Sequence, residues 1–426
     1  MFEVPDGVDE ARLRAEAILD DERGSGLTGR VNRMSIAAEP PVSKRVIIKD
    51  DTIRSGSNTP GVYATNEQKL RIAERLEDAG VVEIEAGYAT VDEHIEFVRE
   101  LKRTGSRLRC AAHCDYFGEG WQGRIDRAVD AGIDVVNLVG MAGYLMPLGL
   151  HPHLDGEAVV ERIREAAAYA KARGAFTAIG TVCSTLPDFD ACVRAALDGG
   201  ADRFYIYDTR GWHTPPVMAF LTRFVRDICG DRMEIAIHCH DDFGMATANS
   251  CEAVRAGADL IDVTMLRTGH RCGNASFEQC VAALESVYGV QTGIRLDRLK
   301  GLAEFVAKEY GLAIPPNAPI VGEHMYTYGG IHVTALLGGN WFIWENLKAE
   351  SVGHRRNVVF GITALQRTSA NPVMAKIRQM GLDYTPEQLE IIFSRLHALV
   401  QAQREASVDE MERIIREVLE GSPNRS

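Results

Sequence analysis

The segment His238-Cys239-His240 holds the most informative pair of reactive side chains in the chain. Because side chains alternate between the faces of a β-strand, both imidazoles would project from one face, roughly 6–7 Å apart. Two imidazoles at that spacing can reach one ion, and histidine combined with oxygen ligands suits a divalent metal such as Zn, Mn, Mg or Co. The alternative is a pair of structural histidines on a buried strand. Asp241 and Asp242 follow directly, which favours the metal site.

A second group of polar residues follows the apolar run 45–50. The guanidinium of Arg54 is suited to stabilising an enolate oxygen or to holding a carboxylate with two N–H groups. Asp50 and Asp51 are candidate metal ligands, supports for ligands, or caps of a strand end. Other runs end in further polar side chains: Glu85, His113, Asp115, Asp208, Thr209, His270, Arg271 and Asn274.

Eight short apolar runs, which must position these residues, alternate with stretches of helical periodicity. Several helical stretches end in Ala-Gly or Gly-Gly and are followed at once by an apolar run, which is typical of a helix cap leading into a strand buried on both faces. Eight such units predict an α/β fold, a closed (β/α)8 TIM barrel, with its catalytic residues at the carboxyl ends of the strands. An open doubly wound sheet is the alternative, but no GxGxxG follows the first run. The runs are 45–50, 81–87, 108–114, 135–140, 176–182, 203–208, 234–240 and 260–264.

The flanking segments divide the chain further. Residues 1–44 are predicted to be an N-terminal extension, with a short helix over 10–21 and no clear period over 24–43. Residues 45–292 are predicted to be the catalytic barrel. Residues 293–426 are predicted to be a linker and a mostly helical subdomain that covers the active site. Within them we expect helices over 294–312 and 386–420.

Composition excludes several classes of function. A formal net charge of −13 disfavours binding to a nucleic-acid backbone. The nine cysteines include no CxxC pair, which favours a reducing compartment and a cytoplasmic protein. No segment approaches the roughly 18 apolar residues of a membrane span.

Five motifs occur in the same order as those of the DRE-TIM metallolyase superfamily, which the chain resembles. They are DDTIRSGSNTPG (50–61), GVVEIEAG (80–87), YDTRGWHTP (207–215), HCHDDFGMATAN (238–249) and TGHRCGNA (268–275). The segments PIVGEHMYTYGGIHVTALL (319–337) and VGHRRNVVFG (352–361) resemble the post-barrel part of isopropylmalate, homocitrate and citramalate synthases. Within a superfamily of HMG-CoA lyase-like barrels, this synthase branch is therefore the most similar.

The resemblance implies roles for individual residues. It assigns the metal to His238 and His240, with Asn274 nearby, and it assigns Arg54 to the family's catalytic arginine. The histidine of the GIH segment corresponds to His332, which the resemblance implicates in acid–base work on an acyl-CoA.

The chain departs from the family pattern at the reacting centre. The acidic metal ligand that directly follows the family's arginine is Ser55 here, and a catalytic glutamate near strand five is replaced by Val182-Cys183. Three explanations are open. Asp50, Asp51 or Asp241 replaces the ligand, Ser55 binds the metal itself or through water, or the metal is lost. We predict a retained metal, with Asp51 and Ser55 as the candidates for the missing ligand.

The resulting hypothesis is a metal-dependent enzyme that condenses an acyl-CoA, most simply acetyl-CoA, with a 2-oxo acid. Arg54 and His332 would carry the chemistry, and Glu85 and Thr209 would contact or support the substrate. The alternatives are a CoA-independent lyase or aldolase that cleaves a 2-hydroxy or 4-hydroxy-2-oxo acid, and a catalytically altered binding barrel. The resemblance also implies a homodimer.

Overall fold

The structure is a computed structural model, and it describes residues 41, 45–140, 156–181, 189–329, 345, 347–361, 372–403 and 405–421. Residues 31–314 form one compact unit, and residues 315–426 belong to a second. Apart from Pro41, the predicted extension 1–44 lies outside the described residues.

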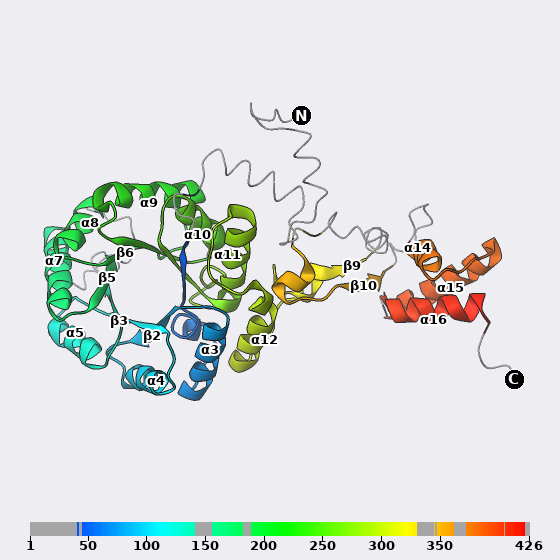
Figure 1. Cartoon of the computed structure of the whole chain (residues 1–426), viewed down its shortest axis with the longest axis horizontal. Coiled ribbons are helices and arrows are strands. Elements are labelled where there is room, and N and C mark those ends of the chain that lie inside the picture. The colour runs from blue at the N-terminus through cyan, green and yellow to red at the C-terminus, as the bar shows by residue number, and fades with distance from the viewer. Residues whose placement is uncertain are drawn as a thin grey trace, which may run out of the picture. The chain divides into compact units, whose positions relative to one another are not determined.

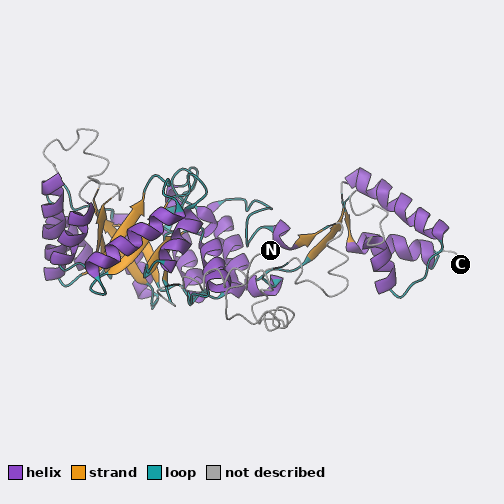
Figure 2. Ribbon diagram, turned by 90° about the horizontal axis from the view of Figure 1, so that it is seen from above, coloured by secondary structure: helices purple, strands orange, loops and turns teal. Residues whose placement is uncertain are grey.

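Eight strands form a closed barrel in which every neighbouring pair is parallel, and helices surround it (Figures 1 and 2). The predicted TIM barrel is therefore confirmed, and each apolar run of the sequence corresponds to one strand, although the second strand ends at Tyr88, one residue beyond its run. The strands are β1 Ile47–Asp50, β2 Glu83–Tyr88, β3 Arg109–Cys114, β4 Val135–Gly140, β5 Phe176–Thr181, β6 Arg203–Asp208, β7 Glu234–Cys239 and β8 Leu260–Val263.

The barrel closes between its first and last strands, where Ile47 pairs with Leu260 and Asp50 pairs with Val263. Its interior is filled by buried side chains rather than by a channel, as expected for a barrel of this size. The buried cluster in the interior consists of small and branched residues and two stacked tyrosines: Ala111, Val135, Val139, Ala178, Ala236 and Leu260, with Tyr205 and Tyr207.

The helices of this unit pack their apolar sides against the barrel. Helix α3 (Asn66–Asp78) begins with a capping box formed by Thr65 and Gln68, and Gly80, at φ 101°, follows its last turn. The other helices are α4 Asp92–Arg103, α5 Trp121–Asp130, α7 Gly156–Ala172, α8 Phe189–Asp198, α9 Pro215–Cys229, α10 Ala246–Arg255, α11 Phe277–Ala283 and α12 Leu299–Tyr310.

The second unit is more mixed than the sequence predicts. It contains helices α14 (Pro372–Gln379), α15 (Pro386–Gln403) and α16 (Val408–Leu419). It also contains a small sheet that the sequence analysis did not predict. That sheet interrupts the single helical tail expected over 386–420. Its strands are only two to four residues long, too short to give a periodic pattern: β9 Thr327–Tyr328, β10 Asn357–Phe360 and β11 Ala406–Ser407.

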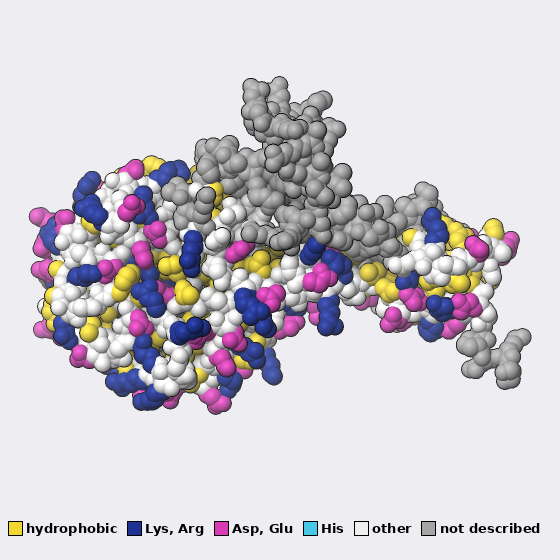
Figure 3. Space-filling view, viewed as in Figure 1, with side chains coloured by type: hydrophobic (Ala, Val, Ile, Leu, Met, Phe, Trp, Pro, Cys, Tyr) yellow, Lys and Arg dark blue, Asp and Glu magenta, His cyan; other side chains and the backbone are white. Residues whose placement is uncertain are grey.

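The surface fits the acidic but mixed composition of the chain. Lysine, arginine, aspartate and glutamate side chains are interspersed over the face of the barrel drawn in Figure 3. Among the described residues, no helix is long and apolar enough to cross a membrane.

Candidate active site

A cavity of about 350 Å³ lies where the carboxyl ends of the barrel strands meet. This is the end at which barrels of this kind carry their catalytic groups. Four imidazoles and two guanidinium groups contribute to its lining, which includes Arg54, Tyr88, His113, Asp115, Val139, Tyr207, Thr209, His238, His240, His270 and Arg271.

His238, on β7, and His240, directly after the end of β7, both line this cavity. Their ring centroids lie 5.2 Å apart, and the ring planes are inclined by 70°. Burial, together with the neighbouring His238, lowers the pKa of His240 to about 3. His240 is therefore a neutral imidazole near neutral pH, which is the form that binds a metal.

Buried charged side chains fix the orientation of the His238 ring. Its Nδ1 lies 2.9 Å from Asp262 Oδ2 on β8. The other oxygen of Asp262 accepts a hydrogen bond from Lys49 Nζ at 3.1 Å. Burial opposes ionisation of Asp262, but Lys49 and then His238 outweigh it and lower the pKa of this carboxyl to about 2. A carboxylate behind a histidine fixes the ring orientation and leaves the second nitrogen available to a metal.

That second nitrogen, His238 Nε2, lies 3.1 Å from Asn274 Nδ2. A backbone bridge between His240 and Asn274 brings the asparagine to the end of β7. Among the described residues, Asn274 Oδ1 and His240 Nδ1 are buried without a hydrogen-bond partner. Unpaired buried acceptors are rare in native proteins, and this set of nitrogen and oxygen donors fits a divalent cation.

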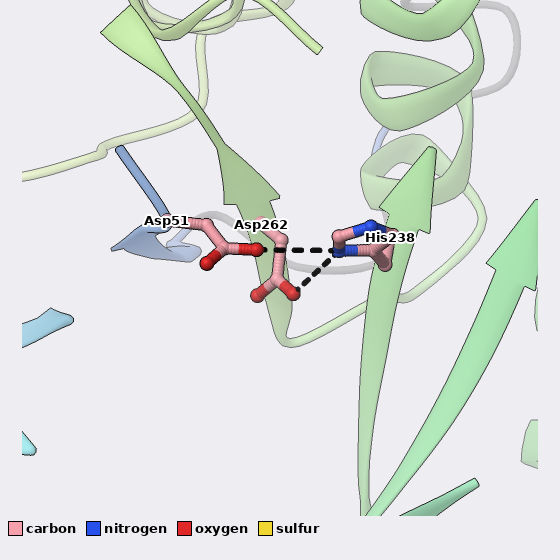
Figure 4. Close-up of side chains that lie close together, drawn as sticks. All are labelled: Asp51, His238 and Asp262. Carbon is pink, nitrogen blue, oxygen red and sulfur yellow. Dashed lines mark hydrogen bonds and ion pairs between the residues drawn. The ribbon is translucent and has the colours of Figure 1, made fainter. Parts of the chain in front are cut away.

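Asp51 and Ser55 lie next to this cluster, on the segment that follows β1. Ser55 donates hydrogen bonds to Asp51 from its amide, at 3.2 Å, and from Oγ, at 2.6 Å. Asp51 Oδ2 lies 3.7 Å from His238 Nδ1, so the carboxylates of Asp51 and Asp262 both face the same ring nitrogen (Figure 4). Asp51, His238 and Asp262 offer ligand atoms within 4.8 Å of one another.

Arg54 presents its guanidinium to the cavity in a fixed position. It donates to Ser55 Oγ at 2.7 Å and to the hydroxyl of Tyr88, and it lies over the Tyr88 ring, 4.7 Å from the centroid. A bulge at the end of β2 sets the direction of the Tyr88 side chain. The bulge requires Gly87, at φ 140°, because a Cβ there would lie 2.5 Å from His94 Cγ. The Nε of Arg54 is buried without a partner, so one donor remains for a ligand.

Glu85 lies beneath the cavity rather than in its lining. Its Oε2 pairs with Lys49 Nζ at 2.7 Å and lies 3.7 Å from His113 Nε2. Burial raises the pKa of this carboxyl to about 7. Glu85 therefore supports Lys49 and His113 from inside the barrel.

Thr209 lines the cavity, and its carbonyl accepts a hydrogen bond from Arg271 at 2.8 Å. Arg271 in turn forms a two-pronged ion pair with Asp242, with distances of 2.7 and 2.8 Å. The backbone of Arg271 has φ 56°, a conformation that non-glycine residues seldom adopt and that is found at binding sites.

Two other carboxylates considered as substitutes for the missing ligand are engaged elsewhere. Asp50 accepts two hydrogen bonds from Thr52. Asp241 accepts from the amide of Ala246, at the start of α10, and pairs with Arg267 at 2.9 Å. Both have local structural roles.

Three residues of the sequence hypothesis, Val182, Cys183 and His332, lie outside the described residues. Conversely, the sequence analysis missed Lys49, Asp262 and Tyr88. Lys49 and Asp262 are charged residues inside runs that are otherwise apolar, and a charge in a fully buried strand is the signal that would have identified them. Tyr88 directly follows Gly87, and only the bulge reveals its direction.

The fold and the site define a class of protein, the (β/α)8-barrel enzymes with a candidate divalent-cation centre at the barrel mouth. A sequence profile of the HMGL-like family matches residues 45–306, and the chain belongs to that family.

Relatives and solved structures agree with this assignment. A homocitrate synthase of Methanopyrus kandleri is 34% identical, over 91% of this chain and 96% of its own. An (R)-citramalate synthase of Methanocaldococcus jannaschii is 33% identical, over 88% of this chain and 74% of its own. The crystal structure of hydroxymethylglutaryl-CoA lyase from Pseudomonas aeruginosa aligns with TM-score 0.54 and 18% identity, covering 64% of this chain and 95% of that one. At that identity the structural likeness supports the fold alone.

Proposed function

We propose that this protein condenses an acyl-CoA, most simply acetyl-CoA, with a 2-oxo acid in a reaction that requires a divalent metal. The observation that carries the proposal is the convergence of Arg54, His238 and His240 on one cavity at the mouth of the barrel. The names of the relatives support it, since homocitrate and citramalate synthases are among them.

A divalent cation held by His238 and His240, with Asn274 beside them, would supply Lewis acidity to the carbonyl of the 2-oxo acid. The ion would be Zn, Mn, Mg or Co, according to the donor set. The protein contributes the orientation of the donors. Asp262 fixes the ring of His238, and burial keeps His240 neutral.

Arg54 acts on the oxygen that becomes an alkoxide when the new carbon–carbon bond forms. Tyr88 and Ser55 hold its guanidinium in place before the substrate arrives, so little reorganisation is needed during the reaction. Its unpaired Nε is the donor available to that oxygen. Thr209, which also lines the cavity, contacts the substrate.

For the acid–base work on the acyl-CoA we propose His332, as the resemblance implies. Glu85 stays a supporting residue, because it reaches the cavity only through Lys49 and His113. A His332→Ala variant that folds normally should lose condensation but keep metal binding. Unchanged condensation would remove His332 from the mechanism.

The direct test is release of free thiol from acetyl-CoA by the metal-loaded protein, with a panel of 2-oxo acids. We expect release that depends on one or a few of the acids and stops when the metal is chelated. If no acid causes release, but a 2-hydroxy or 4-hydroxy-2-oxo acid is cleaved, the protein is a lyase or aldolase. If neither reaction occurs and no metal binds, it is a binding barrel.

We also propose a homodimer in the cytoplasm. Trp212 and Phe243, on the loops after β6 and β7, are 50% and 72% exposed, and a second copy would cover such apolar side chains. Every cysteine in the described part of the chain is a free thiol, which fits a reducing compartment. Light scattering that reports a monomer would contradict the dimer.

A further inference from the structure

Asp51 is a buried carboxylate that forms no direct ion pair with a lysine or arginine in the described part of the chain. Its side chain is 1% exposed. It accepts hydrogen bonds from Ser55, and within the described part of the chain its only ion-pair partner is His238, at 3.7 Å. A histidine balances a carboxylate only when it is protonated, so this pairing supplies no permanent positive charge.

Four neighbouring carboxylates, in contrast, pair directly with a lysine or arginine. The charged partners are Lys49 for Glu85 and Asp262, Arg267 for Asp241, and Arg271 for Asp242. A charge taken out of water is costly unless an opposite charge compensates it. Among the described residues, Asp51 therefore has no lysine or arginine within ion-pair distance, although the charges of Arg54 and Lys49 act on it from further away.

A second, independent observation points to the same place. His240 Nδ1 and Asn274 Oδ1 are buried acceptors without partners, and both residues adjoin His238. A cation would satisfy these acceptors and the carboxylate together. Asp262 is less suited to be a ligand, because Lys49 and the Tyr205 hydroxyl already bind its Oδ1 and its Oδ2 holds the His238 ring.

We propose that Asp51 supplies the carboxylate ligand of the cation, and that Ser55 holds Asp51 in place rather than binding the metal itself. This inference rests on the metal dependence in the proposed function and names the ligand that completes the site. The carboxylate ligand thus comes from position 51, four residues before position 55, which directly follows Arg54. Because Ser55 Oγ is 2.6 Å from Asp51 Oδ2, an acidic side chain at position 55 would reach the same place.

The test is the affinity of the full-length protein for Mn²⁺, measured from the free-ion electron paramagnetic resonance signal. Asp51→Asn keeps the shape of the side chain but removes its charge and one of the two oxygens that accept hydrogen bonds from Ser55. We expect binding to weaken by about 100-fold or more, at or beyond the upper end of the effects seen for residues that support a metal ligand. Asp50→Asn is the matched control, because Asp50 is also buried but, among the described residues, its carboxylate accepts hydrogen bonds from Thr52 alone. The affinity of this variant for Mn²⁺ should not change. Equal binding by wild type and Asp51→Asn, or equal losses in both variants, would overturn the inference.

Two further variants separate loss of a ligand from loss of structure. The double variant Asp51→Asn/Ser55→Asp should regain at least about tenfold of the lost affinity, because it restores a carboxylate beside His238. If Asp51→Asn does not fold, Ser55→Ala decides the question. It removes the hydroxyl that holds Asp51 and should weaken binding by about tenfold. Unchanged binding would then overturn the inference.

Thiol release measured on the same preparations distinguishes this inference from the proposed function. A wild-type protein that binds Mn²⁺ through Asp51 but releases no CoA refutes only the condensation. A protein that condenses its substrates while Asp51→Asn binds Mn²⁺ normally refutes only the ligand assignment.

Discussion

Lys49 is the residue whose loss should affect the barrel most. Its side chain is 0% exposed, and its Nζ lies 2.7 Å from Glu85 Oε2 and 3.1 Å from Asp262 Oδ1. The substitution Lys49→Met retains the length and the apolar stem but removes the charge. It leaves two carboxylates buried without a lysine or arginine partner. Removing one member of a buried ion pair costs about 3–5 kcal/mol, and two stranded partners place the expected loss near the upper end.

Lys69→Met provides a matched control. Lys69 is also buried, at 5% exposed, but its partner Glu93 lies 3.5 Å away with a side chain that is 46% exposed. A pair that remains in contact with water contributes about 0–1 kcal/mol. The two substitutions should therefore differ by about 3 kcal/mol or more in the free energy of unfolding.

The assay is urea denaturation of the metal-free protein, followed by far-ultraviolet circular dichroism. The double variant Lys49→Met/Glu85→Gln should recover part of the loss, because it removes one of the stranded charges. If Lys49→Met were no more destabilising than Lys69→Met, the assignment of a buried charge network beneath the site would be refuted.

Three further predictions follow from the same geometry. Asp262→Asn should weaken Mn²⁺ binding by about 10–100-fold, because Asp262 orients the His238 ring; unchanged affinity would contradict this role. Arg54→Lys should lower the rate of thiol release by about 100-fold or more, while Arg71→Lys on the surface leaves it unchanged; equal rates would exclude a role for the guanidinium. Burial raises the pKa of Glu278, so the stability it contributes is present below its usual value of 4.5 and is lost as the pH rises through the folded pKa. Glu278→Gln should therefore gain stability relative to wild type as the pH rises above 4.5 in urea titrations, and the opposite trend would contradict the shift.

The barrel could be predicted from the sequence because each unit repeats the same local signals. Apolar runs mark strands that are buried on both faces, and glycine at helix ends marks the return to the sheet. The alternation of His238 and His240 was also predictable, since side-chain direction on a strand depends only on position.

The remaining features depend on contacts between distant parts of the chain. Lys49 and Asp262 are 213 residues apart, and only closure of the barrel between β1 and β8 brings them together. The engagement of Asp50 and Asp241 by local hydrogen bonds, which leaves Asp51 as the candidate ligand, likewise needs side-chain directions that no periodic pattern gives. The small sheet of β9, β10 and β11 was missed because its strands are too short to show a period.

The proposed function requires His238 and His240 to bind one divalent cation at the mouth of the barrel. The most direct measurement is an anomalous difference map from crystals of the protein equilibrated with Mn²⁺. We expect a single strong peak between the two imidazoles, from a Mn²⁺ ion that has an oxygen of Asp51 among its ligands. A peak elsewhere, or no peak at saturating Mn²⁺, would contradict it.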